Sequence, residues 1–184
     1  IRRPPISTLF PYTTLFRSLA RPEDGWTLRD VERLAGERFR EVGLPEVADD
    51  EPASTEVLAR YADDGRCWVA VVETDLPIGY VLVDLVDGCA HVEQLSVHPE
   101  HQGSGIGRAL LERVRLWAVD ANLPAITLIT FMDIPWNAPL YRHLGFQVMS
   151  ESAIGPQLRA VRASETAHGR DPAMRVCMRL ALDR

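Results

Sequence analysis

The order of the predicted secondary-structure elements indicates an α+β domain with a mixed central sheet. Two helical segments come first, and three strand-like runs joined by short turns follow them. A β–α–β–α–β half and one more strand complete the chain. Short turns between successive strands are typical of antiparallel pairing, whereas a helix between two strands is typical of a parallel crossover. The sequence therefore predicts a mostly antiparallel mixed sheet flanked by helices.

Composition places the chain among ordinary globular proteins. Its 184 residues are enough for one domain with a sizeable core, and its hydrophobic share of 46% is a usual value. No apolar run reaches the roughly 20 residues that span a bilayer, and no signal-peptide pattern is present. Three widely spaced cysteines predict reduced thiols, not disulfides or a zinc site. We therefore expect a cytoplasmic domain with no metal and no membrane partner.

The charge of the chain bears on its partners. The formal net charge of −6 argues against nucleic acid, because phosphate binding requires a basic face. It is compatible with a cationic substrate. All 20 basic residues are arginine, whose codons are rich in G and C, so we expect a bacterial source.

Residues 1–18 do not read as part of the domain. Residues 8–18 resemble the in-frame translation of a sequencing-library adapter, and the residues before them resemble its continuation upstream. We therefore expect an artefactual tail at 1–18 and a single domain at 19–184, and we exclude the tail from functional reasoning.

The first half of the domain predicts two helices and an antiparallel meander. The first helix follows a capping-box spacing at Thr27 and Asp30 and ends at Gly43, and Ser54 caps the second. Strand-like runs follow at 67–73, 78–86 and 90–97. Asp87-Gly88, between the last two runs, is a strong hairpin signal.

The second half alternates helices and strands. An apolar stripe after residue 105 predicts an amphipathic helix, which Leu123-Pro124 ends. Residues 125–131 predict a strand, 137–145 a short helix, and 146–149 another strand. We expect 151–172 to be irregular apart from one helical turn at 158–161, and 174–182 to form the final strand.

The most informative segment lies between a predicted strand and a predicted helix and reads Gln102-Gly103-Ser104-Gly105-Ile106-Gly107. Glycines lack the Cβ atoms that keep a ligand away from the backbone. Amides at the start of the following helix are free to bind an anion such as a diphosphate, helped by the helix dipole. A Walker loop requires lysine, which this chain lacks, and the Rossmann spacing is not met.

This segment matches the pattern Gln/Arg-x-x-Gly-x-Gly/Ala and so resembles the acetyl-CoA site of the GNAT superfamily of N-acetyltransferases. The segment from Asn137 to Phe146 resembles the family's second signature, which contains an Asn, a Tyr and a Gly-Phe pair. The resemblance extends over nearly all of 19–182. It implies a sheet that is splayed between the strand ending at Val97 and the strand at 125–131.

The resemblance also implies which residues contact the acetyl-CoA co-substrate. Backbone groups of Leu95 and Val97 would bond the pantetheine arm, and the loop amides would hold the pyrophosphate. The implied cofactor-binding residues are Leu95, Val97, Gln102, Gly103, Ser104, Gly105, Ile106, Gly107, Arg108 and Asn137. For Asn137, cofactor contact and capping of its own helix are equal alternatives.

Acetyl transfer to an amine requires a general acid and a general base. The resemblance makes Tyr141 the acid, with a packing tyrosine as the alternative. His91 and Glu93 lie two apart on one predicted strand and so face one side, which Leu95 and Val97 continue. Either residue could serve as the base, and we favour Glu93 because a carboxylate also attracts a cationic amine. An equal alternative is that these residues have no catalytic role and are solvated or salt-bridged residues of the strand.

Other residues are expected around this site. We expect His98, His101 and His143 at the surface near the loop, and Trp136 and Asp133 at the border of the acceptor pocket. The sequence thus predicts an acetyl-CoA-dependent N-acetyltransferase that acts on a primary amine of a small molecule, peptide or protein, as a monomer or homodimer. The alternative is a non-catalytic CoA-binding sensor.

Overall fold

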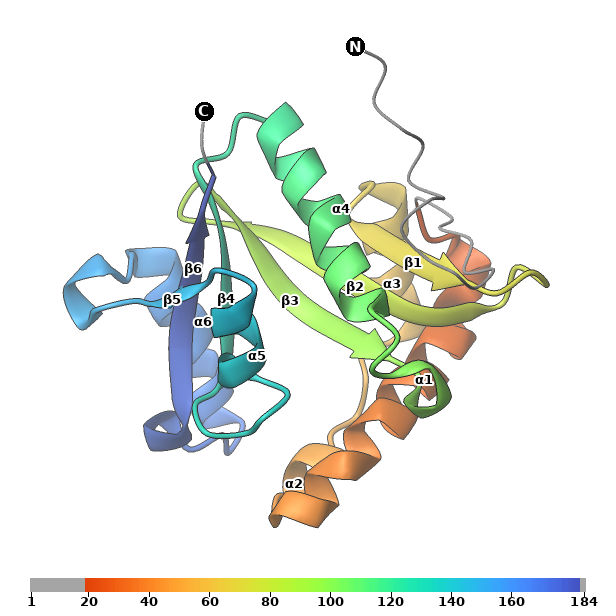
Figure 1. The fold of residues 1–184 in the computed structure, drawn as a ribbon, viewed down its shortest axis with the longest axis horizontal. Coiled ribbons are helices and arrows are strands. Elements are labelled where there is room, and N and C mark those ends of the chain that lie inside the picture. Colours follow the sequence, from red (N-terminus) through yellow and green to blue (C-terminus); the bar gives the residue numbers. More distant parts are fainter. Residues whose placement is uncertain (1–18, 183–184) are drawn as a thin grey trace.

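The computed structural model of the protein describes residues 19–182. The expected tail at 1–18 and the last two residues of the predicted domain lie outside the described residues. Within the described chain, helices cover both faces of one sheet (Figure 1). The fold is therefore the α+β class that the order of elements predicts.

Within residues 19–182 the sheet has six strands, in the order β1-β2-β3-β4-β6-β5. Every neighbouring pair is antiparallel except β3 and β4, which run parallel. The strands are β1 (Cys67–Val71), β2 (Pro77–Val86), β3 (Cys89–Val97), β4 (Ala125–Phe131), β5 (Gln147–Val148) and β6 (Arg175–Ala181). The predicted meander and the predicted mixed sheet are both confirmed.

The hairpin between β2 and β3 forms where the sequence predicts it. Asp87 and Gly88 both have positive φ, 49° and 69°, as a two-residue turn of the primed type requires. Aspartate and glycine are among the residues that tolerate this backbone conformation.

The helices divide between the two faces of the sheet (Figure 1). They are α1 (Gly25–Gly36), α2 (Pro45–Ala48), α3 (Thr55–Asp63), α4 (Ile106–Asp120), α5 (Ala138–His143) and α6 (Pro156–Ala167). Side chains along β1 alternate between the two faces: Trp68 and Ala70 join the core under α4, and Val69 joins the core under α1 and α3.

Two predictions about helices are wrong. The first helix begins at Gly25 and not at Thr27, because a 3-10 turn, η2 (Pro22–Asp24), runs directly into it. Residues 156–167 form the three-turn helix α6, where one turn was expected. The reason lies elsewhere in the chain: the Asp87 carboxylate accepts the Gln157 amide at 3.0 Å and the Leu158 amide at 2.9 Å. A cap supplied by a distant hairpin leaves no local sequence signal.

Candidate active site

A wedge opens between β3 and β4. The two strands pair only from Ala90 to Val92, opposite Ile126 to Leu128, and beyond this point they diverge (Figure 1). A cavity of about 1370 Å³ occupies this region, and residues from both strands line it. The predicted splay of the sheet is therefore confirmed.

The free edge of β3 presents backbone groups to this wedge. The His98 amide donates to the Ile78 carbonyl on β2 at 2.8 Å. Since backbone groups alternate in direction along a strand, Ser96 faces β2 as well, and Leu95 and Val97 face away from it, toward the wedge. The carbonyl of Val97 accepts a hydrogen bond from the Gln102 side chain at 3.0 Å. The geometry required for an added extended chain is present, and its use by pantetheine stays a prediction.

The glycine-rich loop leads into the N-terminus of α4. Gly103 and Gly105 have positive φ, 75° and 88°, and Gly105 is the N-cap. The helical ladder begins with the Ala109 amide donating to Gly105, so the amides of Ile106 to Arg108 lie in the first turn without a helical partner. Gly107 faces Leu95 and Val97, where an added Cβ would make only ordinary contacts at 3.9 Å. This loop therefore offers the donors that an anion needs.

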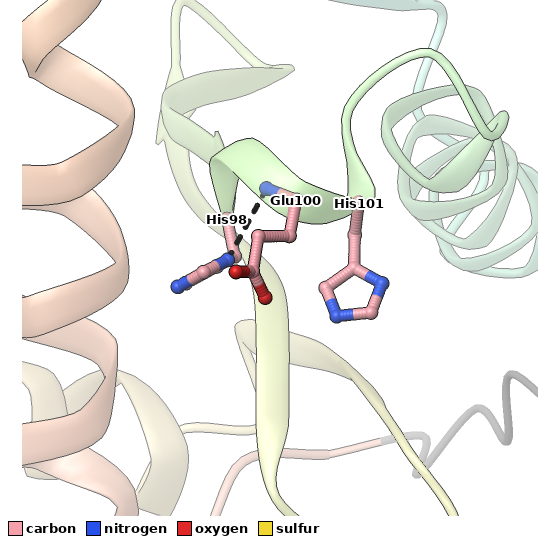
Figure 2. Close-up of side chains that lie close together, drawn as sticks. All are labelled: His98, Glu100 and His101. Atoms are coloured by element: carbon pink, nitrogen blue, oxygen red, sulfur yellow. Dashed lines mark hydrogen bonds between the residues drawn. The ribbon is translucent and has the colours of Figure 1, made fainter.

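Three side chains cluster just before this loop (Figure 2). Ligand atoms of His98, Glu100 and His101 lie within 4.8 Å of one another, and the Glu100 amide contacts Nδ1 of His98 at 3.4 Å. Metal-binding histidines usually have their second ring nitrogen held by a hydrogen bond. Within residues 19–182, no hydrogen bond orients the His101 ring, and Glu100 is exposed. The absence of a metal therefore stays a prediction, and this cluster is where it would be tested.

Asn137 and Tyr141 of the second signature lie at the wedge, at the N-cap of helix α5 and within it. Tyr141 lines the cavity, and its ring packs against Phe146 with centroids 5.6 Å apart. Burial raises the pKa of Tyr141 to about 12. Asn137 does not cap α5 with its side chain, which donates to Thr130 at 2.8 Å instead. Asn137 thus occupies the N-cap position of α5 without a side-chain capping bond, and its Oδ1 is buried without a hydrogen-bond partner among the described residues.

A bulge in β3 overturns the expectation that Leu95 and Val97 lie on the same face of the strand as His91 and Glu93. Leu82 pairs with Gln94 but Val83 pairs with Val92, which leaves Glu93 as an extra residue. A bulge resets the alternation of side chains. Consequently Leu95 and Val97 pack under α4, and they do not continue the face of His91 and Glu93.

His91 and Glu93 face the side of α1, in different environments. His91 is only 2% exposed, and its Nδ1 lies 3.0 Å from Oγ1 of Thr127. Burial lowers the pKa of His91 to about 4. Glu93 lines the cavity with its side chain 47% exposed, and desolvation by the cavity walls, followed by the charge of Asp84, raises the pKa of its carboxyl group. Its Oε2 lies 4.0 Å from Nε2 of His91.

Further carboxylates that sequence reasoning missed line the same cavity. Glu32 on α1 accepts a hydrogen bond from the hydroxyl of Tyr80, which is fully buried. Burial raises the pKa of Glu32 more than this bond lowers it. The available signal was its place four residues after the buried Leu28, on the apolar stripe of the helix. Asp84 on β2 and Glu165 on α6 also line the cavity.

Some of the remaining predicted site residues line the cavity and others do not. Trp136 lines the cavity, whereas Asp133 is exposed and lies outside the lining. His101 and His143 line the cavity, and His143 is exposed as expected. His98 and His101 are partly buried.

The family model described as the acetyltransferase (GNAT) family matches residues 28–146, which is more than half of the chain. The chain belongs to this family. The matched range contains α4, its glycine-rich loop, the wedge and Tyr141. The resemblance that the two signatures indicated is thereby confirmed.

Known proteins resemble the chain in sequence or in fold. The peptidyl-lysine N-acetyltransferase YjaB of Salmonella typhimurium is 26% identical over 99 residues, or 54% of this chain and 62% of that protein. The match thus spans about three-fifths of the relative's length. Ard1 from Thermoplasma volcanium has a TM-score of 0.66 with 14% identity, covering 94% of this chain and 100% of the other.

A third relative was solved with a ligand. The PaiA N-acetyltransferase from Thermoplasma acidophilum, in complex with coenzyme A, has a TM-score of 0.65 and 16% identity, covering 92% of this chain and 99% of the other. At these identities the solved structures establish the fold. No helix in residues 19–182 of this chain is long and apolar enough to cross a membrane.

Proposed function

We propose that the protein is an acetyl-CoA-dependent N-acetyltransferase that acts on a primary amine. The observation that carries the proposal is the wedge between β3 and β4, which joins the glycine-rich loop on one side of the sheet to a carboxylate-lined wall on the other. Such a passage lets a thioester and an amine approach each other from opposite faces. Membership of the acetyltransferase family supports the same activity.

The residues of the loop and of β3 fit acetyl-CoA. The first-turn amides of α4 would bind the pyrophosphate, and the outward backbone groups of Leu95 and Val97 would bond the pantetheine arm. When bound, acetyl-CoA supplies the activated acetyl group.

Glu93 is the proposed general base. The amine nitrogen attacks the carbonyl carbon of the thioester, and Glu93 accepts the amine proton directly or through water. Its raised pKa moves it toward the range in which a base works best. His91 is the weaker candidate, because its ring is buried and bonded to Thr127.

Tyr141 is the proposed general acid. As the C–S bond breaks, the electron pair goes to sulfur, and the Tyr141 hydroxyl donates a proton to the departing thiolate. The products are the amide and coenzyme A. The position of Tyr141 on the cavity wall supports this role.

The cavity wall favours a cationic acceptor. Glu165 pairs with Arg175 at 2.6 Å, but Glu32 and Glu93 have no arginine ion pair among the described residues. The surroundings raise the pKa of both carboxyl groups, and a nearby cation favours the charged form of such a group. A small amine or a peptide or protein lysine would supply that cation, and the name of YjaB supports the lysine option.

Other properties of the protein stay predictions. All three cysteines, at positions 67, 89 and 177, are free and buried, which is compatible with the expected cytoplasmic location. The single domain at 19–184 and a monomeric or homodimeric state likewise remain proposals.

Calorimetric titration with acetyl-CoA tests the cofactor assignment, with ATP and NADH as controls. We expect saturable binding of acetyl-CoA alone. A folded protein that binds none of the three would overturn the proposal. A subsequent panel of amines, followed by release of free coenzyme A thiol, tests the activity. Binding without turnover on a broad panel would favour the sensor alternative.

A further inference from the structure

One arginine touches both sides of the proposed active site. Arg38 lies in the 3-10 helix η3 (Glu37–Val42), which continues α1. Its Nη1 donates to Oε1 of Gln102 at 3.0 Å, and its guanidinium lies 3.6 Å from the centroid of the Trp136 ring. Gln102 belongs to the glycine-rich loop before α4, whereas Trp136 belongs to the loop between β4 and α5. Arg38 therefore spans the wedge.

The contacts continue beyond Gln102 into β3. The Gln102 side chain uses its other end to donate to the carbonyl of Val97 at 3.0 Å. An amide group with both ends bonded in this way is fixed in orientation. The chain of contacts thus runs from Trp136 through Arg38 and Gln102 to a carbonyl that faces the wedge.

The other end of the chain is anchored in a small apolar cluster. The ring of Phe39 packs edge-on against Trp136, with centroids 5.9 Å apart, and at a tilt against Phe131, with centroids 5.5 Å apart. Leu44 and Ile134 are buried in the same cluster. Trp136 is therefore part of a packed wall, and it immediately precedes Asn137 and helix α5.

Electrostatics alone does not explain the position of Arg38. Within residues 19–182 it forms no ion pair, unlike Arg33 and Arg40 on the same segment, which pair with carboxylates. Its partners are instead an amide and an aromatic face. A planar guanidinium can donate in its plane while it stacks through its face, and lysine cannot do both.

We propose that Arg38 is a positioning residue that couples the loop holding the diphosphate to the acceptor wall at Trp136. The inference rests on the proposed function, because it takes the glycine-rich loop as the acetyl-CoA site. A ligand that rearranges Gln102 would move Arg38, and with it the stack on Trp136. Such a link would let the bound co-substrate shape the acceptor pocket.

The test is an acetyl-CoA titration followed by calorimetry and by tryptophan fluorescence. The chain has four tryptophans, so the contribution of Trp136 is the difference between the wild type and Trp136→Phe. We expect acetyl-CoA to change the Trp136 emission in the wild type. In Arg38→Met we expect binding to persist, weakened about 3- to 10-fold, with most of the Trp136 response lost.

Arg33→Met is the matched control. Arg33 lines the same cavity but pairs with Asp30 and Glu51. Its replacement therefore removes one positive charge from the cavity, as Arg38→Met does, but should leave the change in Trp136 emission on acetyl-CoA binding intact. Arg38→Lys keeps the charge and should still lose the response, because lysine cannot both stack and bond Gln102. Gln102→Leu interrupts the same chain of contacts at its other end and should also lose the Trp136 response. This variant provides the test if Arg38→Met does not fold.

The outcomes separate this inference from the proposed function. If acetyl-CoA does not bind the wild type, the proposed function falls and the coupling falls with it. If acetyl-CoA binds with no change at Trp136, or if Arg38→Met keeps the full response at saturation, the coupling is overturned and the acetyl-CoA site stands. Affinity losses that multiply independently in the double variant Arg38→Met/Gln102→Leu would also contradict it, because residues acting in one chain are not additive.

Discussion

The hydroxyl of Tyr141 is protonated at neutral pH, because the ordinary pKa of a tyrosine is about 10 and burial raises the pKa of this side chain further, to about 12. A group that must donate a proton late in a reaction benefits from this state. The residue is partly buried against Phe146 but lines the cavity, so the packing and the catalytic interpretations make different predictions about its hydroxyl.

Replacing Tyr141 with phenylalanine separates these interpretations. The ring and its contact with Phe146 are retained, and only the proton donor is lost. We expect turnover of an accepted amine to fall by about 10²- to 10⁴-fold, while calorimetry gives an unchanged affinity for acetyl-CoA. Turnover equal to that of the wild type at every pH tested would leave Tyr141 with a packing role only.

The residues of the candidate site differ in how far the sequence predicts them. The loop and Tyr141 are readable because glycine spacing and the second signature are local patterns. The side of the sheet on which Glu93 lies cannot be read from the sequence in this way, because the bulge that places Glu93 and Leu95 on different faces arises from the pairing of β3 with β2. Arg38 also leaves no local signal, since both of its partners lie far from it in the chain.

At the scale of elements, α6 depends on a contact that the hairpin between β2 and β3 provides. Asp87 accepts two amides of the first turn of α6. The fit is tight, because a Cβ added at Gly155 would lie 2.3 Å from the Asp87 carboxylate.

Strand β4 was predictable to the residue because its apolar run is bounded by Pro124, whereas α6 buries only Leu158 against the sheet.

We expect Asp87→Ala to destabilise the protein by roughly 2 kcal/mol, because it removes the cap and places an ordinary side chain at positive φ. Asp87→Asn is the matched control: asparagine tolerates this φ but offers one acceptor oxygen, so its loss should be about half as large. Urea unfolding measures both values. Equal stability of the alanine variant and the wild type would show that the cap contributes nothing.

At the scale of the whole molecule, the splayed sheet brings together groups that occupy opposite faces. Leu95 and Val97 pack under α4, whereas Glu93 and His91 face α1. The short parallel pairing of β3 with β4 holds the two halves together at one end and leaves them open at the other. His91 lies within that paired stretch, opposite Thr127, so its protonation bears on the stability of the entire sheet.

Acid should therefore destabilise the protein through His91. Burial lowers the pKa of His91 from 6.5 to about 4, so between these values the unfolded chain binds a proton that the folded chain does not. The stabilisation is complete above pH 6.5 and is lost as the pH falls toward 4. A shift of this size corresponds to roughly 3 kcal/mol.

Urea unfolding at pH 7 and at pH 4.5 measures this loss, with His91→Gln as the comparison. Glutamine can still bond Thr127 but does not titrate, so the variant should be less sensitive to acid than the wild type, although its stability at pH 7 is lower. Carboxyl groups that do not interact with His91 titrate alike in both proteins and cancel in the difference, whereas Glu93 and Asp84, which do interact with it, contribute to that difference. An identical loss of stability in the two proteins would mean that His91 is protonated in the fold, and that its contact with Thr127 does not depend on a neutral ring.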